Sequence, residues 1–427
     1  MNSTRRTVRG AIVVAVLAVT VPKDARAQAS DNADVVIRAG TLIDGRGRRM
    51  TNAAVVIRDG RIVQVLQGQA ATRARPRATI YDLGAATLLP GLIDGHVHAT
   101  QYINASGRLH TQNDSDTPAQ ATLAVALNLR RMLESGVTTA QSMGSTDDAD
   151  FRDAIRAGAI LGPRLITTLN PITNESLTPD SLRALVRQRK AAGADAIKIF
   201  ASRSIREGGT TTMSADQLGA LCGEARSLGL RTLVHAHSEE SIRLAVMAGC
   251  TQVEHGIFVT QDVLNLMAQR GTYFDPQCGL IFQNYLDNRA AYEGIGNFNN
   301  EGFESMKRAM PMAERVIGMA SRTPSLKLVW GTDAVAGAHG REVEDLVCRV
   351  RQGGQPAMDA LASATSRVAE ALGLGQELGV LASGFRADII ATNGDPSREI
   401  EALRRVTFVM QGGRVIKLEQ RGSVRAR

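Results

Sequence analysis

The chain has 427 residues, of which 44% are hydrophobic and 22% charged, a composition that indicates a globular protein and argues against disorder. This length is enough for one large domain and a smaller one. The formal net charge is +8, but residues 1–27 supply half of it, with five basic residues against Asp24. Aromatic residues make up only 4%, and no basic run is interleaved with them, so no nucleic-acid-binding surface is expected.

The first 27 residues have the pattern of an export signal. Arg5, Arg6 and Arg9 precede the apolar run Ala11–Val21, and a small-residue cleavage pattern ends at Ala27. The apolar run is too short to span a bilayer permanently. We therefore predict removal of residues 1–27, export to a bacterial periplasm or the medium, and no stable membrane association afterwards. The Arg5-Arg6 pair leaves the export route, Sec or twin-arginine, open.

The cysteines give no sign of a thiolate metal site, because they are far apart and lack C-x-x-C spacing. They are Cys222, Cys250, Cys278 and Cys348. Export would permit disulfides, but their pairing cannot be read from the sequence. Buried free thiols are the expectation that we favour.

Both ends of the mature chain read as short β-strands separated by turn signals such as Asp59-Gly60. The candidate strands are Val35–Arg38, Ala54–Ile57, Arg61–Val65, Ala387–Ala391, Arg405–Met410 and Gly413–Lys417. The same pattern of short strands occurs on both sides of a central region with a different pattern. It predicts that residues 33–88 and 375–420 pair into one small, discontinuous β-sandwich domain.

The middle of the chain, residues 89–374, alternates strands with helices. The candidate strands are Thr87–His98, Val137–Gln141, Arg164–Thr168, Ala196–Phe200, Thr232–His237, Gln252–His255, Thr272–Phe274 and Leu326–Asp333. Eight strand–helix units in series predict an α/β fold, a parallel (β/α)8 TIM barrel, with its active site at the C-terminal strand ends. The long connections Thr100–Thr117 and Gln277–Asn300 would lie on that face as lids or substrate walls.

The helices between these strands have recognisable ends. Thr178-Pro179 is a cap followed by proline, and Ser214-x-x-Gln217 is a capping box. The segments Ala215–Leu228, Glu239–Ala248 and Asp262–Arg270 each end at or just before glycine.

Residues with metal-binding chemistry fall at the predicted strand ends. The run Leu88–His98 ends in His-x-His, and in a strand residues i and i+2 point the same way. Two packed or surface histidines would give the same pattern. Lys198 lies in an apolar strand, where a bare ammonium is costly to bury. Either an ion pair with Asp195 or Glu254 compensates it, or the neutral amine adds carbon dioxide and becomes a carbamate able to bridge two cations.

The inward candidates from five strands form one ligand set: His96, His98, Lys198, His235, His255 and Asp333. Nitrogen and oxygen ligands without thiolate suit two divalent cations, zinc above all, with manganese or cobalt as alternatives. Two such ions would make a bridging water nucleophilic and polarise a carbonyl. Asp333 would act as the base and then protonate the leaving nitrogen.

With these residues assembled, the chain resembles the amidohydrolase superfamily, and within it the imidazolonepropionase-like branch that contains metal-dependent Xaa-Pro and Xaa-Arg dipeptidases. The motifs that carry the likeness are Pro90-Gly91-x-Ile93-Asp94-x-His96-x-His98, Lys198, Val234-His235-Ala236-His237, Val253-Glu254-His255-Gly256, Gly331-Thr332-Asp333 and Gly384–Ile390. The likeness runs from about residue 34 to 418. It implies that His235 binds metal, that His237 lies beside the substrate, and that Lys198 is carboxylated.

The chain departs from this family pattern after the third strand. Relatives often carry a Gly-Gly-His-Gly segment whose histidine handles the substrate, whereas this chain has residues 167–173 without histidine. His237 and His339 are candidates to polarise the carbonyl, unless they only hydrogen-bond their neighbours. Arg203 could hold a substrate carboxylate, although a solvated surface arginine fits as well. His110 is a candidate lid and substrate-contact residue.

We therefore predict a binuclear metal-dependent hydrolase of C–N bonds that cleaves dipeptides or N-acyl amino acids, in the manner of a dipeptidase or carboxypeptidase. The resemblance includes secreted amidases of the ochratoxin type and implies a small-molecule amide substrate and a homo-oligomer. One alternative is a deaminase or cyclic-amide hydrolase of the same superfamily, but these generally use one metal and no carboxylated lysine. Another is a non-catalytic binding protein of this fold, which would be expected to lack some ligands.

Overall fold

The computed structural model describes residues 34–73, 75, 77–419 and the backbone of 423–425. The residues from 34 onward belong to one compact unit. The predicted export signal at residues 1–27 lies outside the described residues. Within the described ranges, every helix is too short or too polar to cross a membrane.

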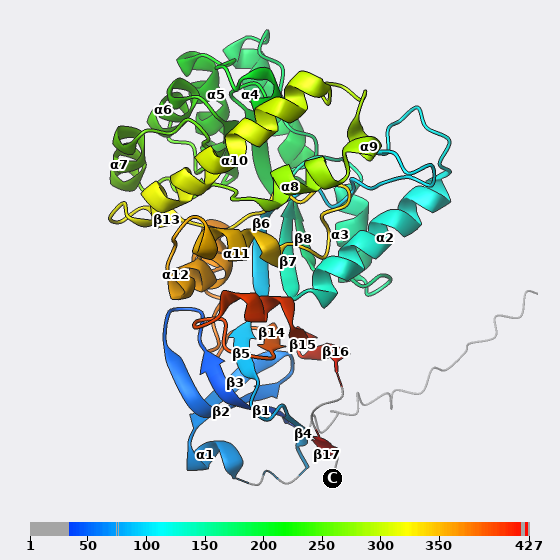
Figure 1. Ribbon diagram of the computed structural model, residues 1–427, viewed down its shortest axis with the longest axis vertical. Coiled ribbons are helices and arrows are strands. Elements are labelled where there is room, and N and C mark those ends of the chain that lie inside the picture. The colour runs from blue at the N-terminus through cyan, green and yellow to red at the C-terminus, as the bar shows by residue number, and fades with distance from the viewer. Residues whose placement is uncertain (1–33, 74, 76, 420–422, 426–427) are drawn as a thin grey trace, which may run out of the picture. The chain divides into compact units, whose positions relative to one another are not determined.

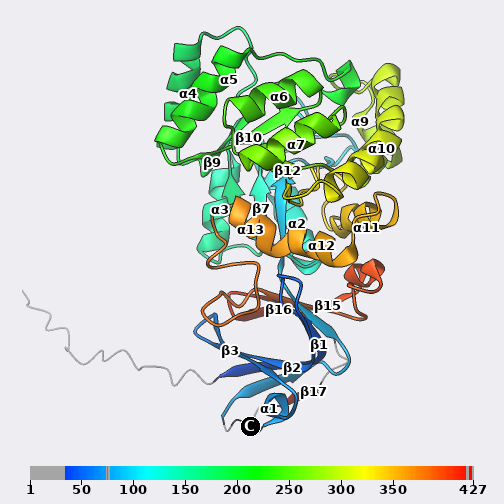
Figure 2. The ribbon, with the colours of Figure 1, turned by 90° about the vertical axis from the view of Figure 1, so that its left-hand side faces the viewer.

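Strands from both ends of the described chain join in one nine-stranded β-sheet (Figures 1 and 2). They are β1 (Val35–Ile43), β2 (Arg49–Arg58), β3 (Arg61–Gln67), β4 (Thr79–Asp82), β5 (Thr87–Pro90), β14 (Ile389–Thr392), β15 (Val406–Gln411), β16 (Arg414–Leu418) and β17 (Ser423–Arg425). The two ends meet where β5 pairs antiparallel with β14. Hydrogen bonds join these strands into one sheet, because β1 pairs with β2 on one side and with β4 and β5 on the other. The two chain ends thus form one β-rich part, and its description as a sandwich stays a prediction.

Eight further strands run between β5 and β14. They are β6 (Leu92–Val97), β7 (Val137–Ser142), β8 (Arg164–Thr167), β9 (Ala196–Phe200), β10 (Arg231–Ala236), β11 (Gln252–His255), β12 (Tyr273–Asp275) and β13 (Lys327–Leu328). They form two parallel sheets, β6-β7-β8 and β13-β12-β11-β10-β9. Single parallel bridges link the two sheets, Ile172 with Ile199 and Val97 with Ala334. Among the described residues no continuous ladder closes the strands, so the closed barrel stays a prediction.

Helices alternate with these parallel strands (Figure 1). The longer ones are α2 (Pro118–Glu134), α3 (Asp148–Arg156), α4 (Pro179–Ala191), α5 (Ala215–Ser227), α6 (Glu239–Met247), α7 (Gln261–Arg270), α8 (Leu280–Asp287), α10 (Asn300–Ser321) and α11 (Val343–Arg351). The short ones are α1 (Gln69–Thr72), η1 (Ile205–Glu207), α9 (Arg289–Tyr292), α12 (Ala357–Ala362), η2 (Ser363–Arg367), α13 (Val368–Ala371) and η3 (Ile400–Arg404). The predicted cap at Thr178 and the capping box of Ser214 and Gln217 are confirmed. The predicted connection Gln277–Asn300 contains α8 and α9.

The single strand predicted at Thr87–His98 is wrong, because the chain changes sheets at Gly91. The Gly91 N–H donates to the Asp388 carbonyl of the large sheet, and the next N–H, of Leu92, donates to Gly136. A Cβ on Gly91 would lie 2.1 Å from the Thr138 hydroxyl oxygen. Only glycine allows this close approach, which sends the following strand, β6, to a different partner.

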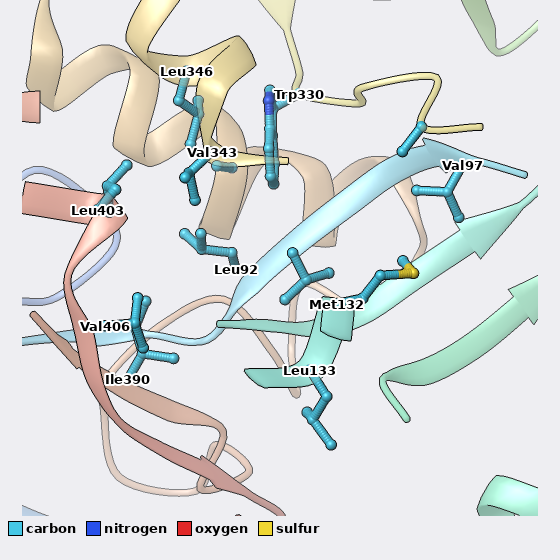
Figure 3. Packing of buried hydrophobic residues seen from close by; sticks show 14 of the residues in the cluster. Leu92, Val97, Met132, Leu133, Trp330, Val343, Leu346, Ile390, Leu403 and Val406 are labelled. Atoms are coloured by element: carbon cyan, nitrogen blue, oxygen red, sulfur yellow. The ribbon is translucent and has the colours of Figure 1, made fainter. Parts of the chain in front are cut away.

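An apolar core joins the large sheet to the base of β6 (Figure 3). Leu92 of β6 packs in one cluster with Ile390, Leu403 and Val406 from the C-terminal strands and helix η3. The cluster also contains Met132 and Leu133 of α2, Val343 and Leu346 of α11, and Trp330. Burial of these side chains anchors the start of the strand whose far end carries His96 and His98.

The four cysteines form two disulfides, so the expectation of buried free thiols is wrong. Cys222 of α5 pairs with Cys250, just before β11, and Cys278 pairs with Cys348 of α11. The pairs are 28 and 70 residues apart in sequence. Such distant pairing depends on how helices pack on neighbouring strands, which the spacing of the cysteines does not reveal.

Candidate active site

The six predicted ligands line one cavity of about 190 Å³. They are His96, His98, Lys198, His235, His255 and Asp333. They come from the ends of β6, β9, β10 and β11 and from the segment after β13. Parallel strands place their carboxyl ends at the same edge, which is why residues so far apart in sequence meet here.

His96, His98, Lys198 and Asp333 form one side of this cluster. The Lys198 Nζ lies 3.3 Å from the Nε2 of His96. An Asp333 carboxylate oxygen lies 3.3 Å from the same Nε2 and 3.0 Å from the Nε2 of His98. Two imidazoles and a carboxylate therefore face one point, with the lysine amine beside them.

Three further imidazoles, those of His235, His237 and His255, form the other side. Their ring centroids lie 4.5 to 5.0 Å apart, and Phe200 stacks on His235 at 4.4 Å. Two trios of ligand atoms each lie within 4.8 Å of one another, His96–His255–Asp333 and His235–His237–His255. Each trio could hold a metal ion, and His255 is common to both. Since the second trio contains both His235 and His237, its geometry does not separate their predicted roles.

Hydrogen bonds on the far side of two rings orient them toward the cavity. The Nδ1 of His96 lies 2.9 Å from Glu254, and the Nδ1 of His255 lies 2.7 Å from the Gln277 side-chain oxygen. If each Nδ1 carries the proton, each Nε2 keeps a lone pair for a cation, which is the usual arrangement around histidine ligands. The sequence did not reveal Gln277 as a partner, although its place two residues past β12, at a strand end, was a usable signal.

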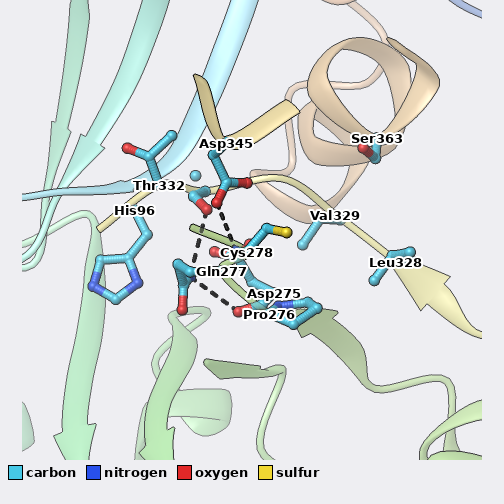
Figure 4. Close-up of polar contacts among 12 residues, drawn as sticks. His96, Asp275, Pro276, Gln277, Cys278, Leu328, Val329, Thr332, Asp345 and Ser363 are labelled. Carbon is cyan, nitrogen blue, oxygen red and sulfur yellow. Dashed lines mark hydrogen bonds between the residues drawn. The ribbon is translucent and has the colours of Figure 1, made fainter. Parts of the chain in front are cut away.

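A second buried carboxylate, Asp94, ties β6 to the segment after β13. It accepts hydrogen bonds from the backbone N–H groups of His96 and Thr332, and from the Thr332 hydroxyl at 2.7 Å. Figure 4 shows His96 and Thr332 near the polar contacts of Gln277, Cys278 and Asp345. Asp94 therefore fixes His96 relative to Asp333, the residue after Thr332.

Burial disfavours the charged forms of several bases at the cavity. It lowers the pKa of His96 to about 3 and holds the pKa values of His235 and His255 well below the ordinary value. It also lowers the pKa of Lys198, against the opposing charges of Glu254 and Asp333. Neutral imidazoles can bind a cation, and a neutral amine can react with carbon dioxide.

Asp333 differs from the bases around it. Burial raises the pKa of its carboxyl, but the imidazoles of His96 and His98 outweigh burial and hold that pKa below its usual range. Asp333 and His255 also have backbone φ values of +54° and +70°. Non-glycine residues rarely adopt this conformation, and those that do cluster at functional sites.

Gly331 allows the segment before Asp333 to approach the cluster closely. A Cβ at this position would lie 2.7 Å from the Cβ of His96 and 2.2 Å from an Asp275 oxygen. Any side chain here would push Asp333 away from the histidines.

The four predicted substrate-contact residues are not all at the cavity. His237 lines it, and its Nδ1 is buried without a hydrogen-bond partner. Arg203 is exposed, forms an ion pair with Glu175 at 2.6 Å, and does not line this cavity. The structure thus brings His237 to the site and leaves Arg203 outside it.

His339 and His110 also lie outside the cavity lining. The Nε2 of His339 lies 3.3 Å from the Gln101 carbonyl, as the hydrogen-bond alternative predicts. His110 stacks on Tyr102, and its Nδ1 lies 2.7 Å from Asp114 in the same loop. Neither contact places the ring against the metal-type cluster.

The sequence missed Arg206, which does line the cavity, three residues after Arg203. It also missed the apolar wall, made by Ile257, Ile281, Phe282 and Val335. Tyr285 lies beside this wall. Most of these side chains come from helix α8 and the loops after β11 and β13, which have no pattern of their own in the sequence.

This set of strand-end ligands agrees with the family that the chain matches. Residues 87–418 match the amidohydrolase family. The chain belongs to the amidohydrolase family. It is therefore a hydrolase, and its histidine and aspartate clusters could bind the metal that amidohydrolases generally require.

Similar amidohydrolases include the ochratoxinase of Aspergillus niger, which is 24% identical over 91% of this chain and 88% of its own length. A crystal structure of a Xaa-Pro dipeptidase with methionine bound in its active site has a TM-score of 0.78 and is 26% identical, over 90% of this chain and 100% of that one. The crystal structure of the A. niger ochratoxinase has a TM-score of 0.75 at 22% identity, over 91% and 96%. The last likeness shows the shared fold.

Proposed function

We propose that the protein is a binuclear metal-dependent amidohydrolase that hydrolyses the amide bond of dipeptides or N-acyl amino acids. The observation that carries this proposal is the convergence of six ligand-type side chains on one cavity, with a buried lysine beside His96. The similarity of the chain to an ochratoxinase and to a Xaa-Pro dipeptidase supports amide bonds as the target.

The donor set fits two divalent cations. His96, His98 and Asp333 would hold one ion, and His235 and His255 the other, since nitrogen and carboxylate oxygens without sulfur suit zinc. Lys198 would serve both ions as a carbamate, formed when its neutral amine adds to the carbon of carbon dioxide and releases a proton. When bound, the two cations would acidify a water and polarise the scissile carbonyl.

The residues of the chain itself supply proton transfer. Asp333 is ionised, faces the centre of the cluster, and is placed to accept a proton from the attacking water and pass it to the leaving nitrogen. His237 lies at the same cavity with an unpartnered Nδ1 and would donate a hydrogen bond to the substrate carbonyl. Glu254 and Gln277 would keep the ligand rings in place.

Three further expectations belong to this proposal. The likeness to solved amidohydrolases supports closure of the two parallel sheets into a (β/α)8 barrel beside a β-rich domain. We also propose export after removal of residues 1–27, and self-association into a homo-oligomer.

The test is to purify the mature chain, load it with zinc in the presence of bicarbonate, and measure hydrolysis of dipeptides and N-acyl amino acids together with bound metal. We expect two metal ions per chain and amidase activity that a chelator removes. Lys198→Ala and His96→Ala should abolish both activity and bound metal, whereas Lys190→Ala, at an exposed lysine of α4, should retain both. Turnover by a metal-free variant would refute the proposal, and a single ion per chain would favour the deaminase alternative.

A further inference from the structure

Arg206 is a cation at the cavity that has no acidic partner. It lies in η1, after β9, and shares the cavity lining with the metal-type cluster. Among the described residues no carboxylate comes within ion-pair distance of its guanidinium, whereas nearby Arg203 is paired with Glu175. Asp333 is the one acidic side chain that lines this cavity, and it is engaged with His96 and His98.

The guanidinium of Arg206 is held in place without being neutralised. Its Nε donates to the Asn297 side-chain oxygen at 2.5 Å, and Asn297 in turn donates to Glu207 at 2.8 Å. Its central carbon lies 4.1 Å from the ring centroid of Phe298 and 5.4 Å from that of Tyr285. Such stacking on buried aromatic rings fixes the plane of the guanidinium.

This arrangement leaves the terminal nitrogens of Arg206 for a ligand. No hydrogen bond joins either of them to a carboxylate or carbonyl in the described part of the chain, and the group's neighbour there is the Tyr285 hydroxyl, which hydrogen-bonds to Arg206. A planar guanidinium whose terminal N–H groups meet no carboxylate matches the two oxygens of a substrate carboxylate. The neighbouring wall of Ile257, Ile281 and Phe282 is apolar and would accept a hydrophobic side chain.

We propose that Arg206 binds the free carboxylate of the amino acid that leaves, so that the cavity selects substrates cleaved at a C-terminal residue with an apolar side chain. This inference rests on the proposed amidase function. It assigns carboxylate binding to Arg206 in place of Arg203. A substrate whose terminal carboxylate is blocked would leave the half-buried guanidinium of Arg206 without an anionic partner.

The experiment compares N-benzoyl-phenylalanine with N-benzoyl-phenylalaninamide, which differ only in the terminal carboxylate. Benzoate release is measured with the zinc-loaded mature protein. We expect wild-type kcat/KM for the acid to exceed that for the amide by roughly 10- to 100-fold, the size of effect typical of a hydrogen-bonded ion pair. Arg206→Gln should bring the ratio close to one by lowering kcat/KM for the acid alone, and Arg206→Lys should give an intermediate ratio.

Two other variants sharpen the result. Arg203→Gln tests the alternative carboxylate site that the sequence predicts. If Arg203 binds the carboxylate, this variant should bring the acid-to-amide ratio of kcat/KM close to one. If Arg206 binds it, the ratio should stay at the wild-type value. Arg243→Gln, at an exposed ion pair with Glu239 in α6, is the matched control and should keep the wild-type ratio. Thermal unfolding of each variant shows whether it is folded. An unchanged ratio in folded Arg206→Gln, or a ratio lost in Arg203→Gln instead, would overturn the inference.

Binding is measured separately, by calorimetry of both compounds with the same variants. If the wild type hydrolyses neither compound, the proposed function has failed for these substrates. The binding measurements still test whether Arg206 binds the carboxylate. Tighter binding of the acid that is lost in Arg206→Gln supports the carboxylate site. Equal binding of acid and amide by the wild type, or no binding of either, overturns it.

Discussion

Two buried polar clusters adjoin each other in this amidohydrolase, and they differ in how their side chains are paired. The cavity cluster consists of the six predicted ligands and His237. The inner network, part of which Figure 4 shows, consists of Glu254, Asp275, Asp345 and Arg349. The two are joined where His96 contacts Glu254 at 2.9 Å.

The inner network is built around one buried cation. Arg349 is fully buried and reaches Asp345 at 2.8 Å, Asp275 at 3.3 Å, and the carbonyls of Val329 and Pro276. One oxygen of Asp275 has no hydrogen-bond partner among the described residues. Burial raises the pKa values of Asp275 and Glu254, and the charge of Glu254 raises that of Asp275 further. Buried polar groups joined to a central cation in this way rigidify a fold.

The cavity cluster keeps imidazole nitrogens without partners. Among the described residues, the Nδ1 atoms of His98 and His237 are buried and make no hydrogen bond, and the Lys198 amine lies near the imidazole of His96 and the ring of Phe200. Buried polar atoms are nearly always paired, so such exceptions need an external partner or a function. Burial of charge, or a single unpaired oxygen such as that of Asp275, therefore does not mark a site by itself, whereas unpaired imidazole nitrogens gathered at a cavity do.

Asp333→Asn should give the largest effect, because it alters the one carboxylate of the cavity cluster. We expect kcat for an N-acyl amino acid to fall on the order of 10²- to 10⁴-fold, the usual contribution of a general acid–base residue. Bound zinc, measured by elemental analysis, separates loss of metal from loss of proton transfer. Asp180→Asn, at an exposed carboxylate of α4, is the control and should match the wild type. Activity within tenfold of the wild type would remove Asp333 from the mechanism.

Arg349→Met should break the inner network, since it leaves Asp275 and Asp345 without their cation. Removing one partner of a buried ion pair costs roughly 3–5 kcal/mol, and we expect that loss in the free energy of unfolding measured with urea. Arg351→Met, two residues further along α11, removes an exposed pair with Glu401 and should cost about 1 kcal/mol or less. Equal losses in both variants would mean that Arg349 is not the centre of the network.

Features that depend on local sequence patterns could be predicted from the sequence. The strand-end ligands follow from local patterns, because an apolar run that ends in histidine fixes both the strand and the direction of its tip, as for His96 and His98. The eight strands and the caps at Thr178 and Ser214 are local as well. Family resemblance added the roles of His235 and Lys198, which stay predictions.

The missed features depend on contacts between distant parts of the chain. Arg206 resembles Arg203 in sequence, and only the packing of Phe298 and Asn297, about ninety residues later, brings it to the cavity. The disulfides depend on how α5 and α11 pack. The break at Gly91 depends on Thr138 and Asp388. The spacing of residues within one segment cannot predict these contacts between distant segments.

The two disulfides should differ in their effect on the metal centre. Each double cysteine-to-alanine variant should lose roughly 2–4 kcal/mol of unfolding free energy, as expected when a closed loop is opened. Only Cys278→Ala/Cys348→Ala should also weaken zinc binding, by about 10-fold or more, since Cys278 follows the Gln277 that orients His255 and its N–H donates to Asp345. Zinc affinity is measured by competition with a chelator. Equal weakening in Cys222→Ala/Cys250→Ala would show that general loosening, rather than the Gln277 contact, is responsible.

Glu342 shares features with both clusters, since it is fully buried with hydrogen bonds from Gly340 and Ser135 but forms no ion pair within the described part of the chain. Burial raises its pKa from 4.5 to about 7. The folded state therefore holds this proton more tightly than the unfolded chain, so its contribution to stability is complete below about pH 4.5 and is lost as the pH rises toward 7. Glu342→Gln removes that loss, and the unfolding free energy of the variant should gain on the wild type by about 1–3 kcal/mol across this window. Glu240→Gln, at an exposed site of α6, is the control, and its unfolding free energy should follow the wild-type pH profile. A Glu342→Gln profile that runs parallel to the wild-type profile would contradict the prediction. It would show that the Glu342 carboxyl is already ionised in the folded protein at low pH.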